Sequence, residues 1–296
     1  MMMKKNWIVG TRGSKLALKQ TQIVIDELKN LYPEYNFILK IIKTKGDTLR
    51  DIPLGETGSK GLFVSEIEEE LLNNKIDLAV HSMKDLPSEL KTGLTIGAML
   101  PREDPRDVFI SNTFKSIAEV KEKGIIGTSS MRRKVQILNI NSKVSVFPLR
   151  GNVETRIKKI EKESLDGIVL AYAGVKRMGF ENTIKEILPL EVMTPPAGQG
   201  AIGIEVRNEE KAIQLLEPLN DANTFHEVII ERKLQSMIGG GCNVPLGIHA
   251  HIHGGTVYLY IFYAPEDKKP LLRVKEKAPI NNVEPLLLHI CALINK

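Results

Sequence analysis

The alternation of strands and helices along the first two-thirds of the chain is the feature that most constrains its fold. Apolar residues recur at helical spacing over 14–31, and short apolar runs typical of buried strands flank this segment at 7–10 and 37–43. The alternation returns after the turn-rich stretch 101–106, with three further strands expected between 124 and 171. Strands that alternate with helices form parallel or mixed sheets with helices on both faces. The sequence therefore predicts two α/β domains.

The pattern changes after residue 220. A helix is followed by two alternating segments at 247–253 and 257–263, and the Gly254-Gly255 pair between them indicates a hairpin. A further strand at 271–276 and a helix at 283–294 complete a small α+β domain with a three-stranded antiparallel sheet. Two capping-box patterns predict helix starts, Ser65-x-x-Glu68 and Thr224-x-x-Glu227.

Residues 201–219 resemble one more strand and helix, and we expect them to return to the first domain. Domain 1 is then 1–100 with 198–219, domain 2 is 101–197 and domain 3 is 220–296. Two α/β lobes joined by paired crossings make a hinged cleft.

The composition is that of an ordinary globular protein, with 42% hydrophobic and 26% charged residues among 296. No apolar run approaches the roughly 20 residues that span a bilayer, and the start of the chain lacks the apolar core of a signal peptide. We therefore expect a cytoplasmic protein. Two cysteines, Cys242 and Cys291, make no disulfide framework. The net charge is +5, but aromatic residues are only 5%, which disfavours nucleic acid as a partner.

Basic residues follow several of the expected strands. They stand in Thr11–Ser14, in Thr128–Arg133, in Arg150–Asn152 with Arg156, and in Lys176-Arg177. Ligand sites of α/β folds form at the carboxyl ends of strands, and backbone N–H groups at a helix N-terminus bind anions. Because arginine suits carboxylates, the pattern predicts a small ligand with several carboxylates. The alternative at 128–133 is an ordinary Ser/Thr N-cap with exposed arginines.

Two further segments carry groups suited to chemistry. Asp85 follows Ser82-Met83-Lys84 at the end of a buried strand, where a carboxylate can stabilise a developing cation or move a proton. The alternative is a simple capping aspartate. Cys242 follows three glycines and precedes Asn243-Val244-Pro245, so the thiol lies on an open loop that suits covalent chemistry. The alternative is a small buried cysteine.

Two other patterns do not support the function that they suggest. Gly198–Gly203 matches the dinucleotide fingerprint, but it follows Pro195-Pro196 and opens a strand rather than a helix, which favours a hinge. His249, His251 and His253 alternate on one strand, yet nothing nearby supplies cysteine or carboxylate ligands at the usual spacing. We expect a solvated or partner-facing strand there, and no metal.

Taken together, seven segments resemble the hydroxymethylbilane synthase family, also called porphobilinogen deaminases, over nearly the whole chain. They are Thr11–Ser14, Ile42–Asp47, Lys60–Phe63, His81–Asp85, Gly127–Arg133, Leu149–Val153 and Gly240–Pro245. The family usually has Gln where this chain has Asn243, and Leu and Gln where it has Met131 and Lys134. These departures remove no functional group.

The resemblance implies two domains similar to a periplasmic-binding-protein pair and a third domain that carries a dipyrromethane cofactor in thioether linkage to Cys242. It implies a transferase of porphyrin (haem) biosynthesis that condenses four porphobilinogen molecules head to tail onto this primer, with loss of ammonia. Hydrolysis then releases the linear tetrapyrrole hydroxymethylbilane. The family suggests a monomer, and we expect no nucleic-acid, membrane or metal partner.

The resemblance also implies roles for individual residues. Asp85 is the catalytic residue, placed to stabilise the cationic azafulvene through pyrrole N–H groups and to assist proton transfer. The expected cofactor-binding residues are Cys242, Ser82, Lys84, Asp85, Thr128, Ser129, Ser130, Arg132, Arg133, Arg150 and Gly151. The expected substrate-binding residues are Arg12, Ser14, Gln20, Lys60, Phe63, Arg150, Arg156, Arg177 and Gln199. Two other functions stay open at this point: a non-catalytic polycarboxylate-binding protein of the same two-lobed architecture, and a basic RNA-binding protein.

Overall fold

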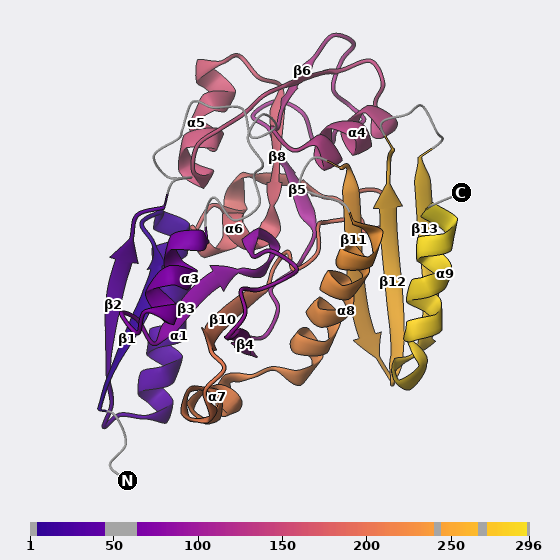
Figure 1. Ribbon diagram of the computed structural model, residues 1–296. Helices are drawn as coiled ribbons and strands as arrows, with labels where there is room; N and C mark the ends of the chain where they lie inside the picture. The colour runs from indigo at the N-terminus through magenta and orange to yellow at the C-terminus, as the bar shows by residue number, and fades with distance from the viewer. Residues whose placement is uncertain (1–4, 45–63, 240–243, 266–270, 295–296) are drawn as a thin grey trace. The chain divides into compact units, whose positions relative to one another are not determined.

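The computed structural model describes residues 5–44, 64–239, 244–265 and 271–294 (Figure 1). The chain forms two compact units. The first comprises Met1–Arg102 and Ala201–His226, and the second comprises Glu103–Gly200 and Glu227–Lys296.

The first unit is built on a five-stranded sheet of order β2-β1-β3-β10-β4. Its strands are β1 (Asn6–Arg12), β2 (Asn36–Ile42), β3 (Leu78–Ser82), β4 (Leu94–Met99) and β10 (Ile202–Arg207). Strand β1 pairs in parallel with β2 and β3, whereas β10 is antiparallel to both of its neighbours, β3 and β4. The segment after residue 200 thus lies inside the first sheet, and β1 and β3 end at the same edge.

Helices cover both faces of this sheet. Helix α1 (Lys15–Leu31) and helix α7 (Glu210–Leu216), which continues into the turn η3 (Glu217–Leu219), pack on one face through residues such as Val24 and Leu216. Helix α3 (Ser65–Leu72) packs on the other face through Ile67 and Leu71. The capping box predicted at Ser65 is wrong, because Val64 is the N-cap and makes no side-chain capping bond.

The second unit contains a five-stranded sheet of order β7-β6-β8-β5-β9. Its strands are β5 (Asp107–Ile110), β6 (Ile125–Gly127), β7 (Ser145–Phe147), β8 (Gly167–Ala171) and β9 (Ile184–Ile187). Helices α4 (Met131–Ile140), α5 (Val153–Lys162) and α6 (Tyr172–Arg177) follow β6, β7 and β8, and the turn η2 (Glu181–Thr183) precedes β9. Strand β5 is antiparallel to β8 and β9. The sequence analysis missed both β5 and β9, because four residues are too few to show a period.

The second unit also contains a three-stranded antiparallel sheet, β11 (Leu246–His253), β12 (Thr256–Tyr263) and β13 (Leu272–Pro279). The turn η4 (Ile280–Asn282) leads into helix α9 (Glu284–Ile294), which packs on one face of this sheet together with helix α8 (Ala222–Ile238) (Figure 1). The predicted fold class, two α/β sheets with a small α+β part, is confirmed. The three-domain boundaries and the hinged cleft stay predictions.

Helix α8 begins before the capping box predicted for it. Asp221 Oδ1 accepts a hydrogen bond from the Thr224 N–H at 2.7 Å, so Asp221 caps the helix and the prediction of Thr224 as its cap is wrong. Two glutamates of this helix reach the edge of β11, where Glu231 Oε1 accepts from the Ala250 N–H and Glu227 Oε1 from the Ile252 N–H, both at 2.8 Å. These bonds satisfy donors that an edge strand would otherwise leave open.

Across the described ranges, every helix is too short or too polar to cross a bilayer.

Candidate active site

A pocket of about 120 Å³ lies in the first unit, at the ends of β1 and β3 and the start of α1. Its lining residues are Arg12, Ser14, Leu16, Ala17, Gln20, Val64, Val80, His81, Ser82 and Asp85. Arg12, Ser14, Gln20, Ser82 and Asp85 are five of the residues predicted for the site. The structure brings them together because β1 and β3 are parallel neighbours, so the residues that follow the two strands meet at one sheet edge.

Hydrogen bonds fix the polar wall of this pocket. Ser14 is the N-cap of α1 and accepts from the Ala17 N–H at 3.2 Å. Gln20, one turn and a half further along the helix, is buried, and its Oε1 accepts from the Ser82 hydroxyl at 3.0 Å. This bond joins α1 to the end of β3, so helix and strand are held in one geometry around the pocket.

The catalytic candidate lies on the one-turn helix η1 (Met83–Asp85) directly after β3. Met83 anchors this turn, since its side chain is 1% exposed and touches the open face of Gly203, where a Cβ atom would lie 2.1 Å from the sulfur. Lys84 and Asp85 are both exposed, and Asp85 lines the pocket. A buried anchor beside an exposed carboxylate presents Asp85 to whatever the pocket holds.

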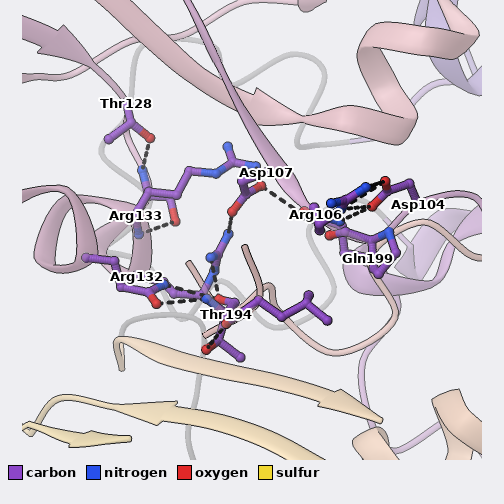
Figure 2. Close-up of polar contacts among 12 residues, drawn as sticks. Asp104, Arg106, Asp107, Thr128, Arg132, Arg133, Thr194 and Gln199 are labelled. Carbon is purple, nitrogen blue, oxygen red and sulfur yellow. Dashed lines mark hydrogen bonds and ion pairs between the residues drawn. The ribbon is translucent and has the colours of Figure 1, made fainter. Parts of the chain in front are cut away.

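A second cluster lies in the second unit, around Asp107 at the start of β5 (Figure 2). Its carboxylate is fully buried and binds Arg132 at 2.8 Å and Arg133 at 2.7 Å. Gln199 donates to Asp107 at 2.9 Å, and Arg132 also donates to the Thr194 carbonyl at 2.6 Å. Figure 2 shows Asp107 between the two guanidinium groups that come from the first turn of α4.

The charges of this cluster do not balance. Burial alone would raise the pKa of Asp107, but the guanidinium groups of Arg132 and Arg133 overcome this effect and hold the pKa well below its usual range. One carboxylate therefore faces two cations. Arg133 Nε is buried and, within the part of the chain that the structure describes, has no hydrogen-bond partner. A surplus positive charge with an unsatisfied N–H is suited to a ligand that carries carboxylates.

The three hydroxyls before α4 mostly serve the helix itself. Ser130 is the N-cap and accepts from the Arg133 N–H at 3.4 Å, and Thr128 accepts from the Ser130 N–H at 3.2 Å. The Ser129 hydroxyl donates to the Leu149 carbonyl at 2.9 Å. The alternative of an ordinary N-cap is thus confirmed for Ser130. Its other part, exposed arginines, is wrong, because Arg132 and Arg133 are buried.

The remaining predicted residues of the second unit lie on two segments. Arg156 donates to the Gly151 carbonyl at 2.7 Å, and Gly151 adopts a φ of 119°, a backbone conformation that favours glycine. Arg150 is half-exposed beside it. Arg177 ends α6 and donates to the Gly200 carbonyl at 2.6 Å. Lys60, Phe63 and Cys242 lie outside the described residues.

Sequence reasoning missed Asp107 as a partner of the arginines. The signal was present, because a charged residue that opens a strongly apolar run, Asp107-Val108-Phe109-Ile110, is buried only when it is paired. Sequence reasoning also assigned no role to Glu205, which is fully buried beside His81 of the pocket lining.

The chain is similar to proteins of one known family. A family model described as "Porphobilinogen deaminase, dipyromethane cofactor binding domain" matches residues 7–215. The porphobilinogen deaminase of Carboxydothermus hydrogenoformans is 44% identical over 283 residues, which cover 95% of this chain and 91% of that protein. The porphobilinogen deaminase of Clostridioides difficile is 42% identical over 293 residues, which cover 98% of this chain and 97% of that protein. Because the family model and both relatives match most of this chain, the chain belongs to the porphobilinogen deaminase family.

Proposed function

We propose that this chain is a hydroxymethylbilane synthase, a transferase of tetrapyrrole biosynthesis. It condenses four porphobilinogen molecules head to tail with loss of ammonia and releases hydroxymethylbilane by hydrolysis. The observation that carries the proposal is the family match over residues 7–215 together with a pocket that both Asp85 and Arg12 line. The match includes the region that the family model assigns to the cofactor.

The cofactor is a dipyrromethane group, for which we propose Cys242 as the point of covalent attachment. When bound, it supplies the primer to which new rings are added. The carboxylates of this group need cations that are already oriented, and the buried Arg132 and Arg133 are such cations. Asp107 holds both guanidinium groups in place and neutralises only one of their two positive charges. The other proposed cofactor-binding residues are Arg150, Lys84, Asp85, Ser82, Thr128, Ser129, Ser130 and Gly151.

We assign substrate binding to the pocket of the first unit. Porphobilinogen carries an acetate and a propionate arm, and Arg12, with Ser14 and Gln20 in the same lining, provides a cation and hydrogen-bonding groups for them. Arg156, Arg177 and Gln199 of the second unit, with Lys60 and Phe63, are the other proposed substrate contacts. Each added ring brings two more carboxylates, which accounts for the number of basic residues.

Asp85 is the proposed catalytic residue. Loss of ammonia leaves a cationic ring, and a carboxylate held in the pocket stabilises the developing charge through the pyrrole N–H and assists proton transfer. The buried anchor Met83 and the Gln20–Ser82 hydrogen bond hold the turn that carries Asp85. Stabilisation of this kind requires a carboxylate that is already in position, because a group that must reorganise during the reaction contributes less.

We further propose a cytoplasmic monomer with three domains, bounded as 1–100 with 198–219, 101–197 and 220–296. A small-molecule substrate is sufficient for the reaction, so the proposal includes no nucleic-acid, membrane or metal partner. The modest net charge of +5 and the basic residues gathered at strand ends support a small polyanionic ligand.

The experiment that tests the proposal measures porphobilinogen consumption and ammonia release by the purified chain. A hydroxymethylbilane synthase releases one ammonia for each porphobilinogen consumed, with one tetrapyrrole formed from four. A polycarboxylate-binding protein of the same architecture would retain porphobilinogen without releasing ammonia, and that result would refute the proposal.

A further inference from the structure

His81 of the pocket lining is paired with the buried Glu205, and the proposed function does not use this pair. His81 lies on β3 opposite Gly203 of β10, and Glu205 lies on β10 opposite Ala79. This register makes His81 and Glu205 diagonal neighbours on one face of the sheet. Their side chains are 5% and 0% exposed, and His81 Nε2 lies 3.0 Å from Glu205 Oε2. His81 is therefore a pocket residue whose ring is fixed from behind by a carboxylate.

The surroundings of the pair are acidic. Glu68 of α3 is buried on the same side, and both burial and the charge of Glu205 raise its pKa. Lys91 lies 3.4 Å from Glu68 and opposes that shift. Asp85 and Arg12 are the other charged residues of the pocket lining.

The hydrogen bond engages one of the two ring nitrogens, Nε2. When Glu205 is ionised, its carboxylate only accepts hydrogen bonds, so Nε2 then carries the hydrogen and Nδ1 carries the lone pair. Across the ranges that the structure describes, Glu205 is the one hydrogen-bond partner of the ring. A base oriented by a third group is the usual arrangement of an activated histidine.

Glu205 itself is held at an energetic disadvantage. Its side chain is fully buried, and Oε1 has no hydrogen-bond partner among the described residues. A buried carboxylate oxygen without a donor is destabilising. An apolar residue at this position of β10 would pack without leaving a buried polar atom unpaired. Stability therefore does not explain the carboxylate, which points to a functional role.

We propose that His81, positioned by Glu205, is a second functional base of the condensation and accepts the proton released when two rings are joined. The inference rests on the proposed function. In each condensation the C–N bond of one aminomethyl group breaks and its electron pair leaves with ammonia. A C–C bond then forms at the α-carbon of the neighbouring ring. The C–H bond at that carbon breaks, and its electron pair returns to the ring. The proton moves to His81 Nδ1 and then to the ammonia, which leaves as ammonium. Asp85 stabilises the cationic ring and assists proton transfer, and His81 is the base that accepts the proton from the α-carbon.

Three variants test this assignment. His81→Gln removes the base, and Glu205→Gln keeps the shape of the positioning residue but removes its charge. The matched control is His249→Gln, because His249 is equally buried and lies 3.1 Å from Glu231, yet it does not line the pocket. Intact mass confirms that every variant carries the covalent cofactor, and thermal unfolding confirms that it is folded.

Two measurements give the readout. Nitrogen-15 NMR of the histidine rings, without added substrate, should show the Nε2–H form of His81 in the parent protein and a changed ring signal in Glu205→Gln. Single-turnover rates are then measured with porphobilinogen that carries hydrogen or deuterium at the free α-carbon. We expect His81→Gln to slow the condensation by about 10²-fold with little change in KM, and to reveal a primary isotope effect that the parent protein masks.

Glu205→Gln should show a smaller loss with the same isotope effect, and His249→Gln should retain the rate of the parent protein. The proposal is overturned if His81→Gln stays within about threefold of the parent rate, or if the rate falls without an isotope effect, which would indicate a purely structural role. A parent protein that consumes no porphobilinogen would refute the proposed function instead.

Discussion

Replacing Asp107 by asparagine tests the electrostatic account of the second unit. The variant keeps the shape of the side chain but removes the one negative charge that Arg132 and Arg133 share, while the two arginine side chains are only 6% and 9% exposed. Breaking a buried ion pair from one side destabilises a fold by about 3–5 kcal/mol, because the remaining charge is uncompensated. For a domain of this size 1 kcal/mol shifts Tm by about 2–4 °C, so we expect a decrease of about 6–20 °C.

The matched control is Asp104→Asn, three residues earlier. Asp104 also binds an arginine, Arg106, but that guanidinium is 41% exposed and the pair is screened by water. Thermal unfolding followed by circular dichroism should therefore show a decrease of less than about 1 kcal/mol for the control. Equal shifts for the two variants, or a shift below about 2 °C for Asp107→Asn, would refute the reasoning.

The pH dependence gives a second check on the same residue. The folded-state pKa of Asp107 lies below the unfolded value of about 3.9, so its stabilising contribution is fully present above that value. The contribution is lost only as the pH falls through the folded-state pKa. The stability difference between the parent protein and Asp107→Asn should therefore stay constant from about pH 5 to 8 and narrow in acid. A difference that changes between pH 5 and 8 would contradict this assignment.

Three further variants and one control variant address the catalytic turn and the small sheet. Asp85→Asn should keep the covalent cofactor, as seen by intact mass, and lose about 10²–10⁴-fold in turnover; near-normal rates would remove Asp85 from its role. Gly247→Ala would place a Cβ atom 2.6 Å from the Thr194 carbonyl oxygen, so urea unfolding should show a loss of about 1–3 kcal/mol, and an unchanged midpoint would argue against this close contact. Glu231→Gln weakens the hydrogen bonds from the Gly198 and Ala250 N–H groups, at 2.6 and 2.8 Å, and should lower the free energy of unfolding by about 1.5–3 kcal/mol in the same measurement. Glu284→Gln, which alters only the exposed pair with Lys233, should cost less than about 1 kcal/mol, and similar losses for both would contradict the importance of burial.

Elements with a strong local signal could be predicted from the sequence. Helix α4 can be recognised from its own residues, since Ser130 supplies a cap and the apolar positions keep a helical period through Ile140. Strand β8 is one of the three strands expected between 124 and 171, because five apolar or small residues between turns are typical of a buried strand. Both signals lie within the segment itself, so no distant residue is needed to recognise them.

Features that depend on distant residues could not be predicted in this way. The capping boxes failed because neighbouring residues, Val64 and Asp221, took the N-cap positions. The direction of the Arg132 and Arg133 side chains depends on Asp107, which lies about 25 positions earlier, so the residues of α4 alone do not indicate it.

The candidate site also has one feature that the sequence predicts and one that depends on distant residues. The meeting of Arg12, Ser14 and Asp85 could be expected, because residues that follow parallel strands share a sheet edge. The His81–Glu205 pair could not, because it joins residues 124 positions apart through an antiparallel register that only the fold defines.

Intact-protein mass spectrometry of the purified chain, beside Cys242→Ala, tests the central claim most directly. If the chain is a hydroxymethylbilane synthase with a covalent primer on Cys242, its mass will exceed the sequence mass by two condensed pyrrole units, and the variant will lack this addition. A chain that is purified without the primer should gain the same mass after incubation with porphobilinogen. An unmodified mass that stays unchanged after this incubation would contradict the account.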